Sequence, residues 1–450
     1  MSVAIIGGGW AGIACAVELA DAGRPVTLYE AAKQLGGRGR GVDWNGIRID
    51  NGQHLMIGAY GETLRLLHRL GTAHLLERRP LRLQVPGFRL ALPRLPAPLH
   101  LATGLLLARG LSLAEKWAAA RFMQALQAIH YRLPEDLPAA TLLHRHRQPP
   151  ALIAKLWAPI CIAALNTPVE AASAQVFCNV LRDSLAGSRA DSDLLMNRAD
   201  LGSLAGDAAL AQLGPRVSLG EKVTGIAARP PRMLKPGALV APASMPAGLS
   251  DAGKDAGATV ETRACFTLTG PEQSAEQVVL AVHPSRLPAL LADLPEMADI
   301  SNAVAGFTWQ PILTLWLRFA TPPVFPFPML GLGDGHAPWA FERRDLAPGL
   351  VAIVMSADGP HIGQPAEQLR DEYLDLLAQA LGPLPALLDW KTITEKRATW
   401  SCIPNLPRPD NTTPVPGLYL AGDYTAGDYP ATLEGAVASG VKCARLILQT

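Results

Sequence analysis

The first thirty residues alternate between short apolar runs and one helical stripe of apolar side chains. Residues 3–6 are all apolar, which is typical of a strand buried inside a parallel sheet. Residues 13–20 repeat apolar side chains at spacings of three and four and predict a helix, for which Gly23 provides a C-cap. Residues 26–30 alternate and end at Glu30. This order predicts a strand–helix–strand unit.

A glycine-rich turn joins the first strand to the helix and reads Gly7-Gly8-Gly9-Trp10-Ala11-Gly12. We expect Gly7 to make the tight turn, Gly9 to let a pyrophosphate approach the backbone, and Gly12 to allow close helix packing. The first helical turn, at Trp10 and Ala11, offers N–H groups to the phosphates. Glu30 can accept hydrogen bonds from both ribose hydroxyls and disfavours a 2′-phosphate. The unit therefore predicts a dinucleotide site.

The remaining apolar patterns divide the chain between two layers. Buried strands at 277–282 and 418–421 extend the first layer, and a helix through 432–447 follows the second of these. The rest predicts a second sheet and several helices, from residues 312–319 and 349–356 and from residues 113–126, 152–162 and 364–381. We predict an α/β fold, in which a Rossmann-like domain carries an inserted α+β substrate or cap domain.

The same reading sets the domain boundaries. The dinucleotide-binding domain takes residues 1–60, 201–285 and 396–450, and the cap domain takes 61–200 and 286–395. Residues 229–258 are rich in proline, glycine and alanine and predict a flexible loop of little function.

The amino-acid composition argues against several classes of protein. The 450 residues carry a net charge of +1, which argues against a nucleic-acid-binding protein. The six cysteines are scattered without metal-binding spacing, so we expect no metal site and a reducing compartment. No segment is typical of a signal peptide or a membrane span, which favours a cytoplasmic location. The apolar fraction of 49% is high for such a protein.

Two further motifs distinguish FAD from NAD. Gly36, Gly37 and Arg38 follow the ribose acid, and residues 50–54 read Asp-Asn-Gly-Gln-His. These motifs resemble those of the flavin amine oxidase and carotenoid desaturase superfamily. The resemblance implies non-covalent FAD, with Gly52, Gln53 and His54 beside the flavin ring and Val223 near the adenine.

The C-terminal motif completes the predicted flavin site. Gly422 and Asp423 follow a short apolar strand, and the resemblance implies that the acid binds the ribityl or pyrophosphate part of FAD. A helix N-terminus then stabilises negative charge on the reduced flavin. The residues that we expect to contribute there are Thr432, Leu433, Glu434 and Ala436.

More specific stretches extend over nearly the whole chain. They are Asn-Gly-Gln-His-Leu-Met-Ile-Gly-Ala-Tyr at 51–60, Trp-Ala-Pro at 157–159, Leu-Asn-Thr-Pro at 165–168, Lys-Arg-Ala-Thr at 396–399 and Gly-Asp-Tyr-Thr at 422–425. Together they resemble the squalene-associated FAD-dependent desaturases of bacterial hopanoid clusters, understood as hydroxysqualene dehydroxylases. The resemblance implies that reduced FAD removes an allylic hydroxyl from hydroxysqualene to give squalene and water.

Such a reaction needs a proton donor. His54 is the first candidate because its motif lies near the flavin and histidine titrates near neutral pH. The alternative is that His54 only hydrogen-bonds backbone or flavin. Tyr60, Tyr429 and Arg397 are weaker candidates. Cys402 is interpreted as a buried thiol, although some amine oxidases attach flavin to a cysteine.

Two other functions fit the same fold. An oxidative desaturase or amine oxidase is compatible with aromatic residues at Tyr424 and Tyr429. A non-enzymatic isoprenoid-binding protein is the third hypothesis, although such proteins tend to lose the glycine motif, which is intact here.

The expected partners follow from the substrate. They are an isoprenoid, an electron donor that the sequence does not specify, and no nucleic acid. We expect loose peripheral contact with the inner face of the membrane through the apolar residues 95–111. The sequence makes no prediction of the oligomeric state.

Overall fold

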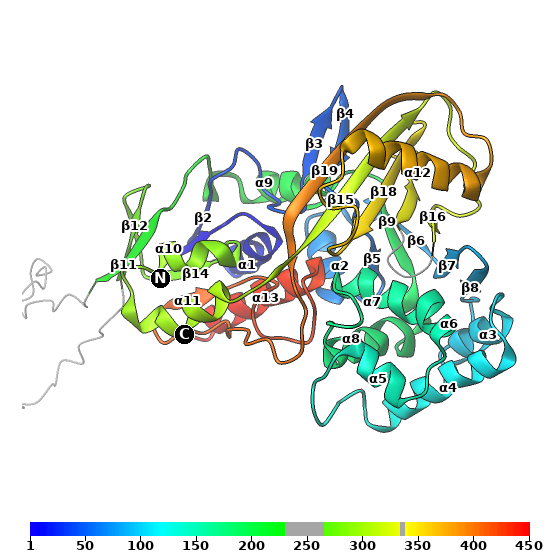
Figure 1. The fold of residues 1–450 in the computed structure, drawn as a ribbon. Helices are drawn as coiled ribbons and strands as arrows, with labels where there is room; N and C mark the ends of the chain where they lie inside the picture. Colours follow the sequence, from blue (N-terminus) through cyan, green and yellow to red (C-terminus); the bar gives the residue numbers. More distant parts are fainter. Residues whose placement is uncertain (230–264, 334–337) are drawn as a thin grey trace, which may run out of the picture.

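A five-stranded parallel sheet forms the centre of one half of the molecule (Figure 1). The structure, a computed structural model, describes residues 1–229, 265–333 and 338–450, so that 230–258 of the predicted loop lie outside the described residues. The spatial order of the strands is β10 (Val217–Leu219), β2 (Val26–Glu30), β1 (Val3–Ile6), β14 (Gln277–Leu280) and β20 (Leu418–Leu420). Nearly every side chain of β1, β14 and β20 is buried, as expected for strands covered on both faces.

Helices from the two ends of the chain pack against each other on this sheet. They are α1 (Trp10–Asp21) and α13 (Leu433–Leu448), with α2 (Gly61–Arg69) and α9 (Asp207–Leu213) beside them. A Cβ at Gly440 would overlap the carbonyl oxygen of Ala11, so this glycine allows the backbones of α1 and α13 to approach closely. The first and last helices therefore belong to one layer.

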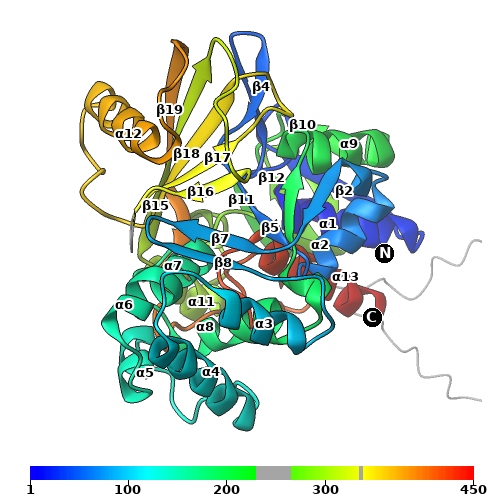
Figure 2. The same ribbon diagram turned by 90° about the vertical axis from the view of Figure 1, so that its right-hand side faces the viewer.

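A second, antiparallel sheet lies beside the first (Figures 1 and 2). Its order is β16 (Met329–Gly331), β17 (Trp339–Glu342), β18 (Leu350–Ser356), β15 (Trp309–Phe319) and β19 (Leu387–Trp400). The amphipathic helix α12 (Ala366–Leu381) covers one face and buries Leu369, Tyr373 and Leu377 against it. The helix stripe predicted at 364–381 and both predicted strands are therefore present.

A group of helices completes the cap. They are α3 (Leu99–Leu107), α4 (Leu113–Ala128), α5 (Ala139–Arg145), α6 (Pro150–Leu152), α7 (Ala158–Leu165) and α8 (Ala174–Leu181). Between α6 and α7 a π-helical turn, Ile153–Trp157, continues the helix up to Pro159. A proline lacks the N–H that an α-helix needs, and the wider turn before it lets the helix continue through Pro159 to Leu165.

Short strands connect these layers. They are the hairpins β3 (Gly41–Trp44) with β4 (Ile47–Asp50) and β7 (Arg82–Val85) with β8 (Phe88–Ala91), the sheet of β5 (Met56–Ile57), β9 (Leu194–Asn197) and β6 (Leu76–Arg79), and the sheet of β11 (Gly225–Arg229), β12 (Cys265–Thr269) and β13 (Gln273–Ala275). Helices α10 (Leu287–Leu290) and α11 (Ala298–Ala305) follow β14.

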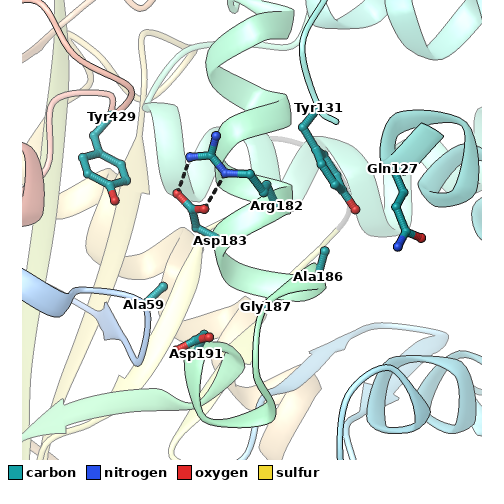
Figure 3. A pocket seen from close by; sticks show the side chains of 9 residues that line it. All are labelled: Ala59, Gln127, Tyr131, Arg182, Asp183, Ala186, Gly187, Asp191 and Tyr429. Atoms are coloured by element: carbon teal, nitrogen blue, oxygen red, sulfur yellow. Dashed lines mark hydrogen bonds and ion pairs between the residues drawn. The ribbon is translucent and has the colours of Figure 1, made fainter. Parts of the chain in front are cut away.

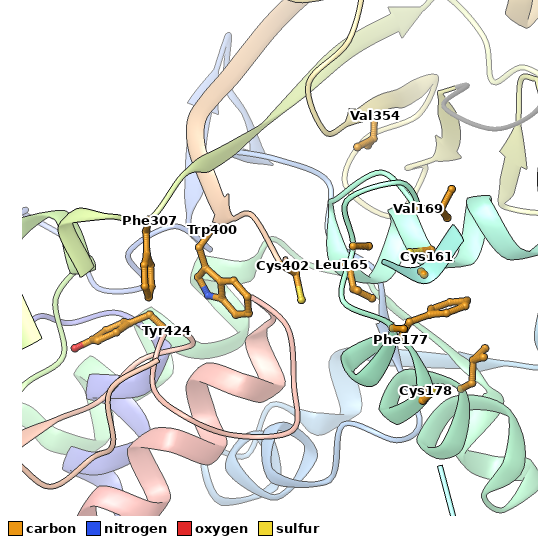
Figure 4. Close-up of a cluster of buried hydrophobic side chains, with 14 of the residues drawn as sticks. Cys161, Leu165, Val169, Phe177, Cys178, Phe307, Val354, Trp400, Cys402 and Tyr424 are labelled. Atoms are coloured by element: carbon orange, nitrogen blue, oxygen red, sulfur yellow. The ribbon is translucent and has the colours of Figure 1, made fainter. Parts of the chain in front are cut away.

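One hydrophobic cluster extends from the cap into the region of the parallel sheet. Figure 4 shows Tyr424, Phe307 and Trp400 on one side and Leu165 and Phe177 of the cap helices on the other. All five are at most 5% exposed, so the halves share a core rather than a hinge. This architecture confirms the predicted α/β fold with a parallel dinucleotide-binding sheet and an antiparallel cap sheet.

Candidate functional site

The glycine-rich turn between β1 and α1 is packed as its residue types require. Gly7 has a φ of 109°, and a Cβ there would overlap the carbonyl oxygen of Ala281 at the end of β14. A Cβ at Gly12 would overlap the carbonyl oxygen of Gly7. These two glycines bring the turn, the sheet and the helix into direct backbone contact, which points the start of α1 at the carboxyl edge of the sheet.

Gly9 has different surroundings. It is the N-cap of α1, it has no side-chain cap, and a Cβ added to it would meet no atom within 4 Å. The first N–H groups of a helix lack intrahelical partners and carry a partial positive charge. A diphosphate fits this cradle. The Trp10 indole donates to the carbonyl oxygen of Gly39 at 3.1 Å, and Ala11 is buried, so Trp10 and Ala11 can contact a phosphate only through their backbone N–H groups.

Glu30 ends β2 beside this turn. Its carboxylate accepts hydrogen bonds from the backbone N–H of Gly8 and of Ala32, each at 2.7 Å. A carboxylate has about four acceptor positions, so two are left for ribose hydroxyls. The N–H of Glu221 donates to the Glu30 carbonyl oxygen at 3.0 Å, which brings the buried Val223 to the same end of the site.

The second glycine motif lies directly against the first. The N–H of Gly36 donates to the carbonyl oxygen of Gly8 at 2.8 Å, and a Cβ at Gly37 would lie 3.1 Å from the Gly9 Cα. Gly37 also has a φ of 59°, which favours glycine. Both motifs therefore border the same diphosphate cradle.

Arg38 connects the N-terminal and C-terminal motifs. Its guanidinium donates to the Asp423 carboxylate at 2.7 Å and to the carbonyl oxygen of Ala398 at 2.6 Å. Asp423 is almost fully buried, whereas Arg38 is about one third exposed. This charge-assisted hydrogen bond holds the Asp423 carboxylate in a fixed orientation.

A buried hydrogen-bond network fixes the loop that carries Asp423. The N–H of Gly422 donates to the Ser439 hydroxyl at 3.0 Å, and this hydroxyl lies 2.7 Å from that of Thr425. The Asn411 amide donates to the same oxygen at 2.9 Å. Arg408 donates to four backbone carbonyl oxygens of residues 423–429, and its guanidinium lies 4.6 Å from the centre of the Trp400 ring. Sequence reasoning missed Asn411 and Arg408, because no motif surrounds either.

Helix α13 begins at the same edge. Thr432 is its N-cap and accepts a hydrogen bond from the N–H of Gly435 at 3.1 Å, while Leu433 and Ala436 are partly buried in its first turn. The Glu434 carboxylate accepts the N–H groups of Glu62 and Thr63, each at 2.9 Å. It therefore caps α2, and only the backbone of Glu434 is available to a cofactor.

A buried charge pair supports the segment from Asp50 to His54. Arg343 on the loop after β17 lies 3.5 Å from the Asp50 carboxylate, and it also donates to the side-chain oxygen of Gln53 and to the carbonyl oxygen of Asn197 at 3.2 Å. The Asp50 carboxylate accepts the N–H of Leu201 at 2.6 Å. Sequence reasoning missed Arg343, because an arginine far along the chain carries no local signal of a buried partner.

His54 is held by its own loop. Its Nδ1 lies 2.6 Å from the carbonyl oxygen of Gly52, which assigns the proton to Nδ1 and leaves Nε2 as an acceptor. Burial lowers the pKa of His54, against the opposing effect of Asp50. The neutral imidazole therefore predominates at neutral pH. The positive charges of Arg343 and, to a smaller extent, Arg38 lower the pKa of His54 further.

The predicted tyrosines form a second group at the start of α13. Burial raises the pKa of Tyr60, whose hydroxyl is hydrogen-bonded to the Thr432 side chain. Burial also raises the pKa of Tyr429, to about 12. Tyr429 lines a cavity of about 410 Å³. Figure 3 shows the Arg182–Asp183 ion pair of the cap between Tyr429 and Tyr131 in this cavity. Both tyrosine hydroxyls keep their protons through neutral pH.

The remaining candidate residues differ in their exposure to solvent. Arg397 is exposed on β19. Cys402 is 1% exposed, and burial raises the pKa of its thiol to about 12, which keeps it protonated. Tyr424 is fully buried, and its hydroxyl donates to the carbonyl oxygen of Leu280 at 3.4 Å. His283 lies just after the carboxyl end of β14, and burial lowers its pKa to about 4.

Comparison with known proteins identifies the architecture around this site. Residues 10–448 match the family model described as flavin containing amine oxidoreductase. A hydroxysqualene dehydroxylase of Rhodopseudomonas palustris is 29% identical over 99% of this chain and 98% of its own length. A zeta-carotene desaturase of Synechocystis is 47% identical, but over only 16% of this chain and 15% of its own.

Solved structures agree on the fold. A cyclohexylamine oxidase of Brevibacterium oxydans superposes with a TM-score of 0.68 and 17% identity, covering 100% of this chain and 98% of its own. At that identity the similarity concerns the fold alone. Among residues 1–229, 265–333 and 338–450, no helix is long and apolar enough to cross a bilayer.

Proposed function

The chain belongs to the flavin containing amine oxidoreductase family, and from this premise we propose that it is an FAD-dependent hydroxysqualene dehydroxylase. The proposed reaction removes the hydroxyl group of hydroxysqualene and gives squalene and water. It is a reduction, so the flavin must be reduced beforehand by an electron donor. This activity would place the protein in bacterial squalene biosynthesis.

The extent of the sequence similarity carries the proposal. The hydroxysqualene dehydroxylase relative aligns over almost its entire length, including both cap segments. The carotene desaturase aligns over a short stretch, despite its higher identity there. Because the cap determines which substrate reaches the flavin, similarity in the cap is a better guide to the substrate than similarity in the nucleotide-binding motif.

The residues of the parallel-sheet half suit the cofactor. When bound and reduced, FAD supplies a hydride. Glu30 would bind the adenosine ribose, the start of α1 and the two glycine motifs would bind the diphosphate, and Asp423, oriented by Arg38, would bind the ribityl chain. FAD is expected to be non-covalent, because the Cys402 thiol is buried and protonated.

The proposed dehydroxylation also requires protein residues that donate a proton and that exclude water from the site. The carbon–oxygen bond of the substrate breaks, a proton joins the leaving oxygen to make water, and a hydride joins the carbon. His54 and the tyrosine group of Tyr60 and Tyr429 are the candidate proton donors. The buried aromatic cluster shared by the two halves keeps this region of low polarity, which strengthens electrostatic interactions there.

Two observations weigh against the alternatives. An amine oxidase would be expected to place aromatic side chains beside the flavin, but Tyr424 is a core residue whose ring packs under Gly422. An isoprenoid carrier without flavin would not need a glycine at position 9, where a Cβ would meet no atom within 4 Å, yet the glycine is present. Tyr429 is an aromatic residue that lines the cavity, so the oxidative alternative is included in the test below.

The test compares both directions of electron flow in the purified holoprotein. Reduced protein is mixed anaerobically with hydroxysqualene, and oxidised protein is mixed separately with aliphatic amines and with a carotenoid polyene. We expect the yellow flavin absorbance to return only with hydroxysqualene and to stay unchanged in the oxidised samples, with squalene as the control ligand. Bleaching of oxidised flavin by an amine or polyene would overturn the proposal, and a protein that binds no FAD would favour a carrier.

A further inference from the structure

Five large apolar side chains are exposed together on two neighbouring cap helices. We name them the leucine face: Leu99, Leu106 and Leu107 of α3, and Leu113 and Trp117 of α4, which are between 55% and 76% exposed. Both ribbon views place α3 and α4 side by side at one end of the molecule, away from the chain termini (Figures 1 and 2). Contiguous exposed apolar surface marks an interaction site, whereas single exposed residues do not.

Packing beneath α3 forces its leucines outward. On its inner side lie His100, which is 1% exposed, and Gly104, where a Cβ would lie 2.5 Å from a methyl carbon of Leu92. A larger residue than glycine would lift the helix off β8. Because this side is so close to the strand, Leu99 and Leu106, roughly a third of a turn away around the helix, remain on its outer side. Leu107 is exposed because it is the last residue of α3, where no further turn covers it.

Two lysines hold the helices in this arrangement. Lys116 of α4 donates to the carbonyl oxygen of Leu106 at 2.6 Å, at the C-terminal end of α3. Lys155 donates to the carbonyl oxygen of Gly110 in the connecting loop at 3.2 Å. These hydrogen bonds fix α3, the connecting loop and α4 to one another, so the two parts of the leucine face lie on neighbouring helices.

The charges around this surface are strongly one-sided. Residues 91–121 contain four basic side chains, Arg94, Arg109, Lys116 and Arg121, and a single acidic one, Glu115. Glu115 is engaged in a capping box with Ser112 and accepts from its N–H at 2.7 Å and its hydroxyl at 2.8 Å. The chain as a whole carries a net charge of only +1, so the excess is local.

We propose that the leucine face docks on the surface of an anionic lipid bilayer. Leucine and tryptophan side chains enter the boundary between head groups and acyl chains, while arginine and lysine around them pair with anionic head groups. A second copy of the chain is a poorer occupant, because a symmetric contact would bring the same basic residues against each other.

The position of the face suits a substrate that dissolves in membranes. Helix α4 carries Trp117 near its start and Gln127, which lines the cavity with Tyr429, ten residues later. At 1.5 Å per residue these positions are roughly 15 Å apart along the helix. The inference does not depend on the proposed reaction, since membrane binding is measured without substrate.

The experiment is flotation of the full-length holoprotein with vesicles. One set contains phosphatidylglycerol and phosphatidylcholine, and the other phosphatidylcholine alone. We expect binding to the anionic vesicles that weakens at high salt, and at least a tenfold lower partition coefficient for the variant Leu106→Ser, Leu107→Ser, Trp117→Ser. The control variant Val324→Ser, Leu388→Ser removes exposed apolar side chains that lie elsewhere and should bind like the wild type.

A second variant, which removes charge instead of apolar surface, shows whether a loss of vesicle binding comes from misfolding. Arg109→Gln with Arg121→Gln changes exposed side chains only, and it should reduce binding to anionic vesicles several-fold while flavin content stays the same. Wild-type protein that stays off anionic vesicles, or a triple serine variant that binds them undiminished, would overturn the inference. So would a wild-type dimer that the serine variant dissociates while vesicle binding persists, since the face would then join two copies.

Discussion

At the scale of single residues, the glycines of the cofactor site matter because they have no Cβ. Gly7, Gly12 and Gly37 are required by backbone packing. Gly9 is not, because no atom of the described chain would meet its Cβ. We therefore propose that the diphosphate of the cofactor requires glycine at position 9, so substitution there should separate cofactor binding from folding.

The Gly9→Ala variant should fold with a loss of at most about 1 kcal/mol, the usual cost of alanine at a helix N-cap. Its affinity for FAD should fall at least tenfold, because the new methyl group occupies the path of the diphosphate. Gly61→Ala is the matched control, since a Cβ there also meets no atom within 4 Å. Titration of the flavin-free protein with FAD measures both affinities, and equal affinities would contradict the assigned diphosphate position.

The Arg343–Asp50 pair is the clearest residue-scale feature that sequence reasoning missed. Both side chains are at most 2% exposed, and removing one partner leaves an uncompensated buried charge. We expect Arg343→Met to lower the free energy of unfolding by about 3–5 kcal/mol. Denaturant titration of the variant measures this loss. The double variant with Asp50→Leu should recover part of it, and a double variant that is no more stable than Arg343→Met would contradict the pairing.

The pH dependence of the reaction discriminates between the candidate proton donors. Burial lowers the pKa of His54 from its usual 6.5, and a rate that needs protonated His54 should be highest below that pKa and fall tenfold per pH unit above it. The raised pKa of Tyr60 and that of Tyr429, about 12, keep both hydroxyls protonated, so either tyrosine would give a flat profile from pH 6 to 9.

The measurement is kcat as a function of pH for the wild type and for His54→Gln. We expect a decline with an apparent pKa below 6.5 in the wild type and its disappearance in the variant. A flat wild-type profile, together with a large loss of activity in Tyr60→Phe or Tyr429→Phe, would transfer the role to the tyrosine group.

At the scale of elements, the apolar period predicted most strands and helices close to their observed bounds. The helix stripe at 113–126 corresponds to α4 at Leu113–Ala128, and the strand at 312–319 to β15 at Trp309–Phe319. Periodicity could not predict that α6 and α7 are joined by a π-helical turn, because residues 150–165 are apolar almost throughout and have no stripe that an extra residue would shift. It also could not show that Glu434 caps a different helix, because α2 and α13 meet only in the folded chain.

The contact between α1 and α13 gives an element-scale prediction. A methyl group at Gly440 would overlap the backbone carbonyl of Ala11, which cannot rotate away as a flexible side chain would. We expect Gly440→Ala to lower the free energy of unfolding by about 1–3 kcal/mol. This loss outweighs the higher helix propensity of alanine. Thermal unfolding measures the effect, and a Gly440→Ala protein as stable as the wild type would contradict the close packing.

At the scale of the whole molecule, the first and last segments of the chain build one site with the cap inserted between them. The glycine motifs and the Gly422-Asp423 motif each predicted part of the flavin site, and the Arg38–Asp423 ion pair joins them at 2.7 Å. Composition left a high apolar fraction to explain, and the exposed leucine face and the core shared by both halves account for part of it. Arg343 and Arg408 form hydrogen bonds to segments that are distant in the sequence. Their roles could not be predicted, because these segments meet only in the folded chain.

The most direct test of the proposed function is one anaerobic turnover. Holoprotein is reduced to a known amount of reduced flavin, mixed with excess hydroxysqualene, and quenched, and squalene is then quantified by mass spectrometry. The account predicts close to one squalene for each flavin that is reoxidised. Flavin that remains reduced, with no squalene formed, would contradict it.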